Sequence, residues 1–141
     1  MRCVMFKTVL FPVDQSRETR EAAEVVTNVV QQYGSRLILL SVIETSSDEG
    51  EAPNPDALAS PEMVAELLKN AQALFSQQGI EATTMSREGM PAFTICDVAD
   101  DIGADLIVMG CRGLGLTEEG AAESVTNRVI NLSPCPVLIV P

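Results

Sequence analysis

Phe6-Lys7-Thr8-Val9-Leu10-Phe11-Pro12-Val13 is a near-continuous apolar run close to the start of a 141-residue chain. Such a run is typical of a strand that is buried on both faces of a parallel sheet. Residues 36–43 form a second run of the same kind, and helical periodicity fills the interval. Ser16 is a candidate N-cap for this helix and Gly34 a candidate stop. The apolar positions of the predicted helix are Ala22, Val25, Val26, Val29, Val30 and Tyr33.

The rest of the chain continues the alternation of strands and helices. Residues 44–60 are rich in Ser, Asp, Glu and Pro and lack a period, which predicts a long loop. Ser60 and Pro61 predict the start of a second helix, as N-cap and first helical residue. Its predicted inward face consists of Val64, Leu67, Leu68, Ala71, Leu74 and Phe75. The later predictions are an edge strand at 81–87, a helix at 91–102, a strand at 105–109, a short helix at 124–132 and a strand at 136–140.

Five strands alternating with four helices predict a doubly wound five-stranded parallel sheet of the α/β class, with helices on both faces. We expect residues 1–141 to form one domain, since the length suits one domain and no internal boundary is visible. In such folds a ligand binds at the carboxyl ends of the strands, where the strand order reverses. Here those ends are Val13-Asp14, Val42-Ile43 and Met109-Gly110.

Charge and composition exclude several classes of partner. The chain has 20 acidic and 9 basic residues, a net charge of −11, which argues against binding to nucleic acid or to an anionic membrane surface. No apolar run approaches the roughly 20 residues of a membrane-spanning helix. The first residues lack the pattern of a signal peptide, so we expect a cytoplasmic protein. The region between Arg36 and Lys69 contains acidic residues and no cation; it is a solvated acidic loop or, alternatively, a surface for a basic partner.

The residue types that most often carry catalysis are scarce. Histidine is absent, which removes the common general base and the commonest metal ligand. Cys3, Cys96, Cys111 and Cys135 form no CxxC pair and no zinc spacing, and we expect reduced thiols. Because no nucleophile–base pair is apparent, the sequence predicts a protein that is not an enzyme, although slow incidental hydrolysis of ATP stays open.

One segment has the composition of a phosphate site. Residues 110–126 follow a predicted strand, contain four glycines and lead into a helix. Glycines let backbone N–H groups approach an anion, and a helix N-terminus adds positive potential. The segment is not a Walker A loop, since no Gly-Lys-Ser/Thr follows, and Glu118 stands where GxGxxG needs its last glycine.

The whole chain resembles the universal stress protein family. The matching blocks are residues 9–16, 39–43, 89–91 with Ile95, 104–114 and 133–140. The resemblance implies strand order 3-2-1-4-5, a homodimer paired through the last strand and a role in resistance to stress. The family it resembles has two branches, of which one binds ATP and the other does not, and the resemblance implies that this chain belongs to one of them.

The binding branch has a motif of Gly, two residues, Gly, nine residues, then Gly-Ser/Thr. Gly110, Arg112 and Gly113 fit its first half; Ser124, Val125 and Thr126 fit its end. Glu123 replaces the last glycine and adds a side chain and a negative charge where phosphates would lie. The resemblance further places the adenine and the ribose on Pro12, Asp14, Val42 and Met109, which match the binding branch.

Two functions therefore remain as hypotheses. The first is a homodimeric stress-response regulator that binds an adenine nucleotide, ATP or AMP, with magnesium entering only with the nucleotide. The alternative is a dimeric interaction module that binds no nucleotide. Three residues of the segment and site also have a purely structural interpretation: Asp14 suits a turn, Ser124 suits a helix N-cap and Cys111 suits a small buried position. Residues 44–60 are long enough to act as a lid over a bound ligand.

Overall fold

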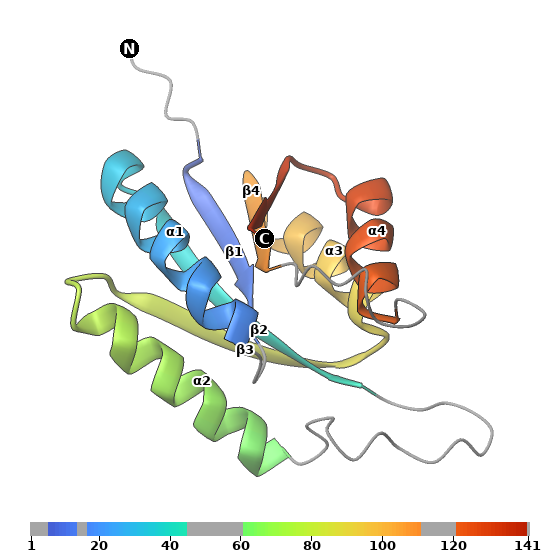
Figure 1. The fold of residues 1–141 in the computed structure, drawn as a ribbon, viewed down its shortest axis with the longest axis horizontal. Helices are drawn as coiled ribbons and strands as arrows, with labels where there is room; N and C mark the ends of the chain where they lie inside the picture. The colour runs from blue at the N-terminus through green and yellow to red at the C-terminus, as the bar shows by residue number, and fades with distance from the viewer. Residues whose placement is uncertain (1–5, 14–16, 45–60, 111–120, 141) are drawn as a thin grey trace.

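The computed structural model describes residues 6–13, 17–44, 61–110 and 121–140, and within them five strands alternate with four helices (Figure 1). The order along the chain agrees with the predicted α/β alternation. The elements are β1 (Thr8–Pro12), α1 (Arg17–Tyr33), β2 (Arg36–Glu44), α2 (Pro61–Ser76), β3 (Ala82–Gly89), α3 (Pro91–Ile102), β4 (Leu106–Gly110), α4 (Ala121–Leu132) and β5 (Val137–Val140).

The strands form one parallel sheet in the order β3-β2-β1-β4-β5, which confirms the expected order. β1 lies at the centre of the sheet. The chain adds β2 and then β3 on one side of β1, and β4 and then β5 on the other, so the strand order reverses between β1 and β4. β3 and β5 are the edge strands, and the many polar residues of β3 suit a position with only one neighbouring strand.

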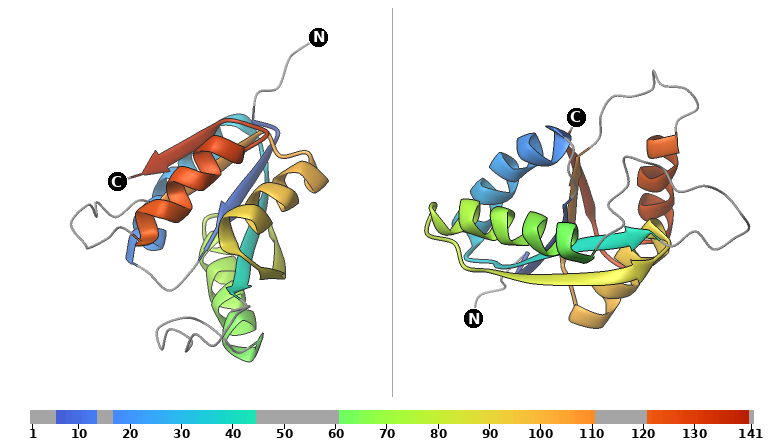
Figure 2. Two further views of the ribbon diagram at one scale, coloured as in Figure 1. Left: turned by 90° about the vertical axis from the view of Figure 1, so that its right-hand side faces the viewer. Right: turned by 90° about the horizontal axis from the view of Figure 1, so that it is seen from below.

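Helices cover both faces of the sheet, so its strands are buried on two sides. α1 and α2 pack on one face, and α3 and α4 on the other (Figure 2). Successive residues of β1 point to opposite faces. Val9 and Phe11 therefore belong to the layer under α1 and α2, and Leu10 to the layer under α3 and α4.

Several boundaries and one inward position differ from the predictions. β1 begins at Thr8, because Phe6 has a left-handed backbone (φ 56°) that no strand can include. α4 begins at Ala121, three residues earlier than predicted, so Ser124 lies inside the helix and is not its N-cap. Leu74 was expected in the core but is 50% exposed, whereas its neighbour Phe75 is 1% exposed. Tyr33 is exposed too, although its ring packs edge-on against Phe6 with centroids 5.2 Å apart.

The amino ends of the strands are tied together by hydrogen bonds that involve side chains. The Ser35 hydroxyl donates to the Phe6 carbonyl at 2.5 Å, which holds the left-handed residue in place. The backbone N–H of Thr8 donates to the Asp105 carboxylate at 3.0 Å, and the Asp105 N–H donates to the Thr8 carbonyl at 2.8 Å. β1 and β4 are thereby joined firmly at this end.

The start of α3 is set by close packing. Gly89 has φ 147°, and a Cβ built on it would lie 2.6 Å from the Thr94 hydroxyl oxygen. Glycine is therefore required at the end of β3. Pro91 follows in the first turn of α3, and Gly103 ends the helix in a left-handed conformation, both as predicted.

Candidate functional site

The carboxyl ends of β1, β2 and β4 lie at one edge of the sheet, because the three strands are parallel neighbours. This edge carries four of the predicted site residues within the described part of the chain: Pro12, Val42, Met109 and Gly110. It is also where the strand order reverses, the position at which open α/β sheets bind ligands. Three of the four residues that the resemblance assigns to adenine and ribose, Pro12, Val42 and Met109, therefore lie at the same edge of the sheet.

β1 is paired very differently with its two neighbours. Its pairing with β2 runs from Thr8↔Arg36 to Pro12↔Leu40, whereas its pairing with β4 ends at Leu10↔Ile107. Beyond that pair, Phe11 and Pro12 are not paired with residues 108–110 of β4, although all of them belong to strands. We call this part of the sheet the β1–β4 split. It lies at the carboxyl edge, among the site residues.

Three apolar side chains of the layer under α3 and α4 lie near this edge, where the exposed Arg87 of β3 also lies opposite Val42. Met109 is 8% exposed, and Val42 is partly buried in the same layer. Met85 of β3 is partly buried there as well, opposite Leu40 of β2. Sequence reasoning missed Met85, since it lies in the most polar strand; the alternation of that strand is the signal that could have found it. All three side chains belong to the apolar layer under α3 and α4.

The rest of the predicted site is described only in part. Asp14, Arg112 and Gly113 lie outside the described residues, as do residues 45–60 and Cys111. Ser124, Val125 and Thr126 follow Ala121 in the first part of α4. α4 connects the parallel strands β4 and β5, so it begins at the carboxyl edge. The positive end of its dipole is thus on the ligand side of the sheet.

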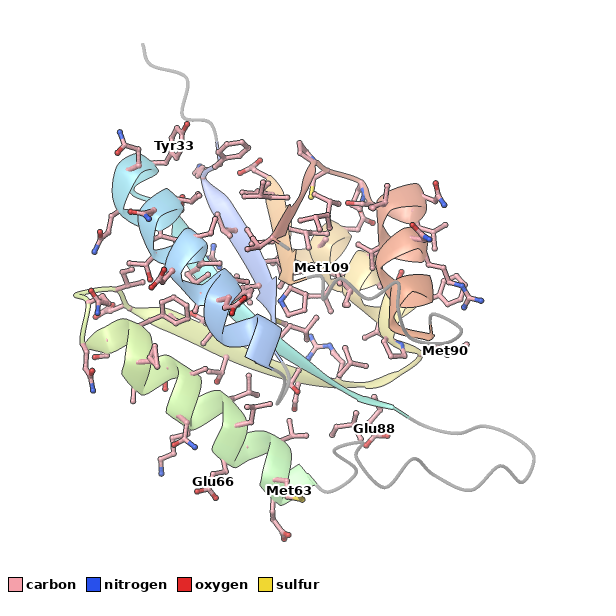
Figure 3. The ribbon with its side chains drawn as sticks, viewed as in Figure 1. Tyr33, Met63, Glu66, Glu88, Met90 and Met109 are labelled. Carbon is pink, nitrogen blue, oxygen red and sulfur yellow. The ribbon has the colours of Figure 1, made fainter. Side chains whose placement is uncertain are left out.

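Charged and exposed residues near the edge come from several elements. Figure 3 shows Glu88 and Met90 at the end of β3 and Met63 at the start of α2, all remote from Tyr33 at the other end of the molecule. Within residues 6–13, 17–44, 61–110 and 121–140, no group of three or more His, Cys, Asp or Glu could hold a metal ion. None of the helices described there is long and apolar enough to cross a membrane.

Of the four cysteines, Cys96 and Cys135 lie in the described part of the chain, and both are free thiols. Burial raises the pKa of the Cys96 thiol above its ordinary value, and the negative charge of Asp97 raises it further. Burial also raises the pKa of the Cys135 thiol, while a hydrogen bond with Ser133 partly opposes this. A raised pKa lowers the fraction of the reactive thiolate at neutral pH.

We expect Cys96 and Cys135 to be alkylated by iodoacetamide at pH 8 at least about tenfold more slowly in the folded protein than in urea. Because the pKa of each thiol is raised on folding, the folded-state rates should still be rising at pH values where those of the unfolded chain have levelled off. Site-resolved mass spectrometry of quenched samples measures both rates. Equal rates at pH 8 in the folded and the unfolded protein would contradict the assignment of buried, unreactive thiols.

The strand order β3-β2-β1-β4-β5 makes this a doubly wound α/β protein. Open sheets of this class have their ligand sites at the carboxyl edge, where the strand order reverses. The model of the universal stress protein family matches residues 5–141, and the chain belongs to this family. A universal stress protein of Synechocystis sp. is 64% identical over 98% of this chain and 87% of its own length.

Solved structures support the fold along the whole chain. The universal stress protein UspA from Lactobacillus plantarum is 26% identical, covers 97% of this chain and 99% of its own, and superposes with a TM-score of 0.80. A universal stress protein in complex with cAMP (24% identity, 97% and 98% coverage, TM-score 0.76) has the same fold. So does one from Archaeoglobus fulgidus in complex with dAMP (19% identity, 97% and 99% coverage, TM-score 0.73).

Proposed function

We propose that this universal stress protein is a homodimeric regulator that binds an adenine nucleotide of the ATP or AMP type. The observation that carries the proposal is the β1–β4 split at the carboxyl edge, with Pro12, Val42, Met109 and Gly110 around it. Binding of cAMP and dAMP by two other members of the family supports the choice of an adenine nucleotide.

The described residues suit the base end of such a ligand. Met109, Val42 and Met85 offer an apolar surface for the adenine ring, and Gly110 brings backbone close to the ribose without a side chain. On the family pattern, Asp14 would hold the ribose, and Arg112, Gly113, Ser124, Val125 and Thr126 would face the phosphates. Magnesium would enter only with the nucleotide and would neutralise part of the phosphate charge.

A thermal-shift series tests the proposal directly. ATP, AMP and cAMP, each with and without magnesium, are added to the full chain at millimolar concentration, with GTP as the control for the base. A ligand present at 100 times its Kd adds about 2.7 kcal/mol to the free energy of unfolding. That gain raises the midpoint by several degrees in a chain of this size. The absence of a shift with every adenine nucleotide would overturn the proposal.

The second candidate is an interaction module that binds no nucleotide. Glu123, in the first turn of α4, favours it, because a carboxylate at the phosphate end opposes an anionic ligand. Nucleotide binding by the wild type separates the two candidates, and removing the charge at position 123 tests whether Glu123 prevents that binding. In both, we infer a cytoplasmic binding protein that is not an enzyme, supported by the absence of histidine from the sequence.

Dimerisation through the last strand is part of both candidates. β5 is an edge strand whose free side can pair with another strand, and Leu138 on it is 37% exposed. Sedimentation equilibrium of the wild type and of Leu138→Lys tests this interface. A dimer mass that falls towards the monomer in the variant supports the proposal, and a monomeric wild type overturns it.

A further inference from the structure

β1 has a proline at the last position of a strand that lies in the middle of the sheet. Proline is normally confined to edge strands, strand starts and bulges, because it cannot donate a hydrogen bond to a neighbouring strand. Pro12 nevertheless pairs in register with Leu40 of β2, and the next residue, Val13, donates its N–H to the Leu40 carbonyl at 2.8 Å. On the β2 side, the proline interrupts nothing.

On the other side of β1, the same proline removes a bond. The backbone N–H groups of a central strand point alternately to its two neighbours. Since Val13 donates to β2, the backbone nitrogen of Pro12 faces β4. In β4, the N–H of Ile107 donates to the Pro136 carbonyl at the β5 side, so the backbone polar groups of Val108 face β1. The next bond after Leu10↔Ile107 would therefore run from the nitrogen of residue 12 to the carbonyl of Val108.

We propose that Pro12 is a positioning residue for the nucleotide site, because its missing N–H ends the β1–β4 ladder one bond before the site. Any other residue type at this position supplies an N–H that can extend the pairing into Phe11 and Val108. The split would then close from the end that is already tied by Thr8 and Asp105. The effect of Pro12 on nucleotide binding rests on the proposed function. The claim that Pro12 ends the β1–β4 pairing rests only on the register of the two strands.

The split leaves the Val108 carbonyl without a donor from residue 12, because proline has no N–H to offer it. Val108 is 0% exposed, so this carbonyl belongs to the interior of the sheet. Pro12 therefore acts on the site through the pairing of β1 with β4.

The test is Pro12→Ala in the full chain, which adds an N–H at position 12. We expect this new backbone amide to be protected from hydrogen exchange and to show a through-hydrogen-bond scalar coupling to the Val108 carbonyl. We expect AMP and ATP to bind about fivefold more weakly, because a closed split must lose one backbone bond of about 1 kcal/mol before the ligand enters. Pro134→Ala, at an exposed position near the other end of the sheet, is the matched control and should leave affinity unchanged.

A second variant separates the N–H from the proline ring. Replacing Pro12 with lactic acid gives the methyl side chain of alanine with an ester in place of the amide, so it has no N–H. Both variants lose the proline ring, and only Pro12→Ala gains an N–H, so the lactic acid variant should bind nucleotide about fivefold more tightly than Pro12→Ala. If the amide at position 12 of Pro12→Ala exchanges freely, the missing N–H of Pro12 is not what ends the β1–β4 pairing. If that amide is protected but the nucleotide affinity is unchanged, the end of the pairing does not affect the nucleotide site. A wild type that binds no nucleotide would defeat the proposed function, while the amide at position 12 would still decide what ends the ladder.

Discussion

Replacing Glu123 with glycine is expected to strengthen ATP binding by about two orders of magnitude. A carboxylate about 5 Å from a phosphate charge costs about 3 kcal/mol at an effective dielectric of 20, which corresponds to a factor of about 200. Position 123 lies in the first turn of α4, where backbone N–H groups would otherwise face an anion. AMP should gain less than ATP, because it has fewer phosphate charges. Isothermal titration calorimetry at low ionic strength measures both affinities.

Two further variants identify the cause of the gain. Glu123→Gln removes the charge and keeps the side-chain volume, so it should recover most of the gain if the effect is electrostatic. Glu81→Gln makes the same charge change at the amino end of β3, far from the site, and should alter affinity little. An ATP affinity that is the same in the wild type and in Glu123→Gly would remove the electrostatic argument, and with it the support that Glu123 gives to the interaction module.

The largest loss of stability is expected from Phe75→Ala. Phe75 of α2 is 1% exposed and packs edge-on against Phe11 of β1, with ring centroids 6.1 Å apart and planes at 88°. Truncating a buried phenylalanine removes its transfer free energy and leaves a cavity, which costs about 3–5 kcal/mol of unfolding free energy. Urea denaturation should show a lower midpoint with an unchanged m-value.

The neighbouring residue is the control. Leu74 lies one position earlier on the same helix and is 50% exposed, so Leu74→Ala should change the free energy of unfolding by no more than about 0.5 kcal/mol. Similar losses for the two variants would show that α2 packs on the sheet through a different face from the one described.

The same pair shows how far the sequence predicts the fold. Apolar runs located four of the five strands, and the more polar β3 was predicted as an edge strand. The glycines and prolines at residues 34, 61, 91 and 103 marked helix ends correctly. Leu74 and Phe75 fit one broad apolar stripe, and only the angle at which α2 lies on the sheet places one of them outside. The start of α4 was predicted late, because Ser124 is a good N-cap residue but three helical residues precede it.

The candidate site was predictable in composition but not in its central feature. The rule for doubly wound sheets and the family resemblance placed Pro12, Val42, Met109 and Gly110 at one edge, where the structure has them. The β1–β4 split depends on the register between segments about a hundred residues apart, which periodicity does not contain. Proline at the end of a strand assigned to the middle of a sheet was the available signal for it.

The uneven pairing of β1 has a mechanical consequence. The sheet can be divided into two parts, β3-β2-β1 and β4-β5, which meet at the boundary between β1 and β4. Two residue pairs are in register across this boundary, against eight between β2 and β3. α1 packs against β4 and β5 and also contributes to the core over β1 and β2, so it connects the two parts of the sheet across the boundary between β1 and β4. A load that pulls the two parts of the sheet apart would therefore be carried by α1, by α3, which packs in one layer with β2, β1 and β4, and by the hydrogen bonds between Thr8 and Asp105. A ligand that contacted both β1 and β4 at the carboxyl edge would connect the two parts of the sheet at the end opposite Thr8 and Asp105. It would thereby reduce their movement relative to each other.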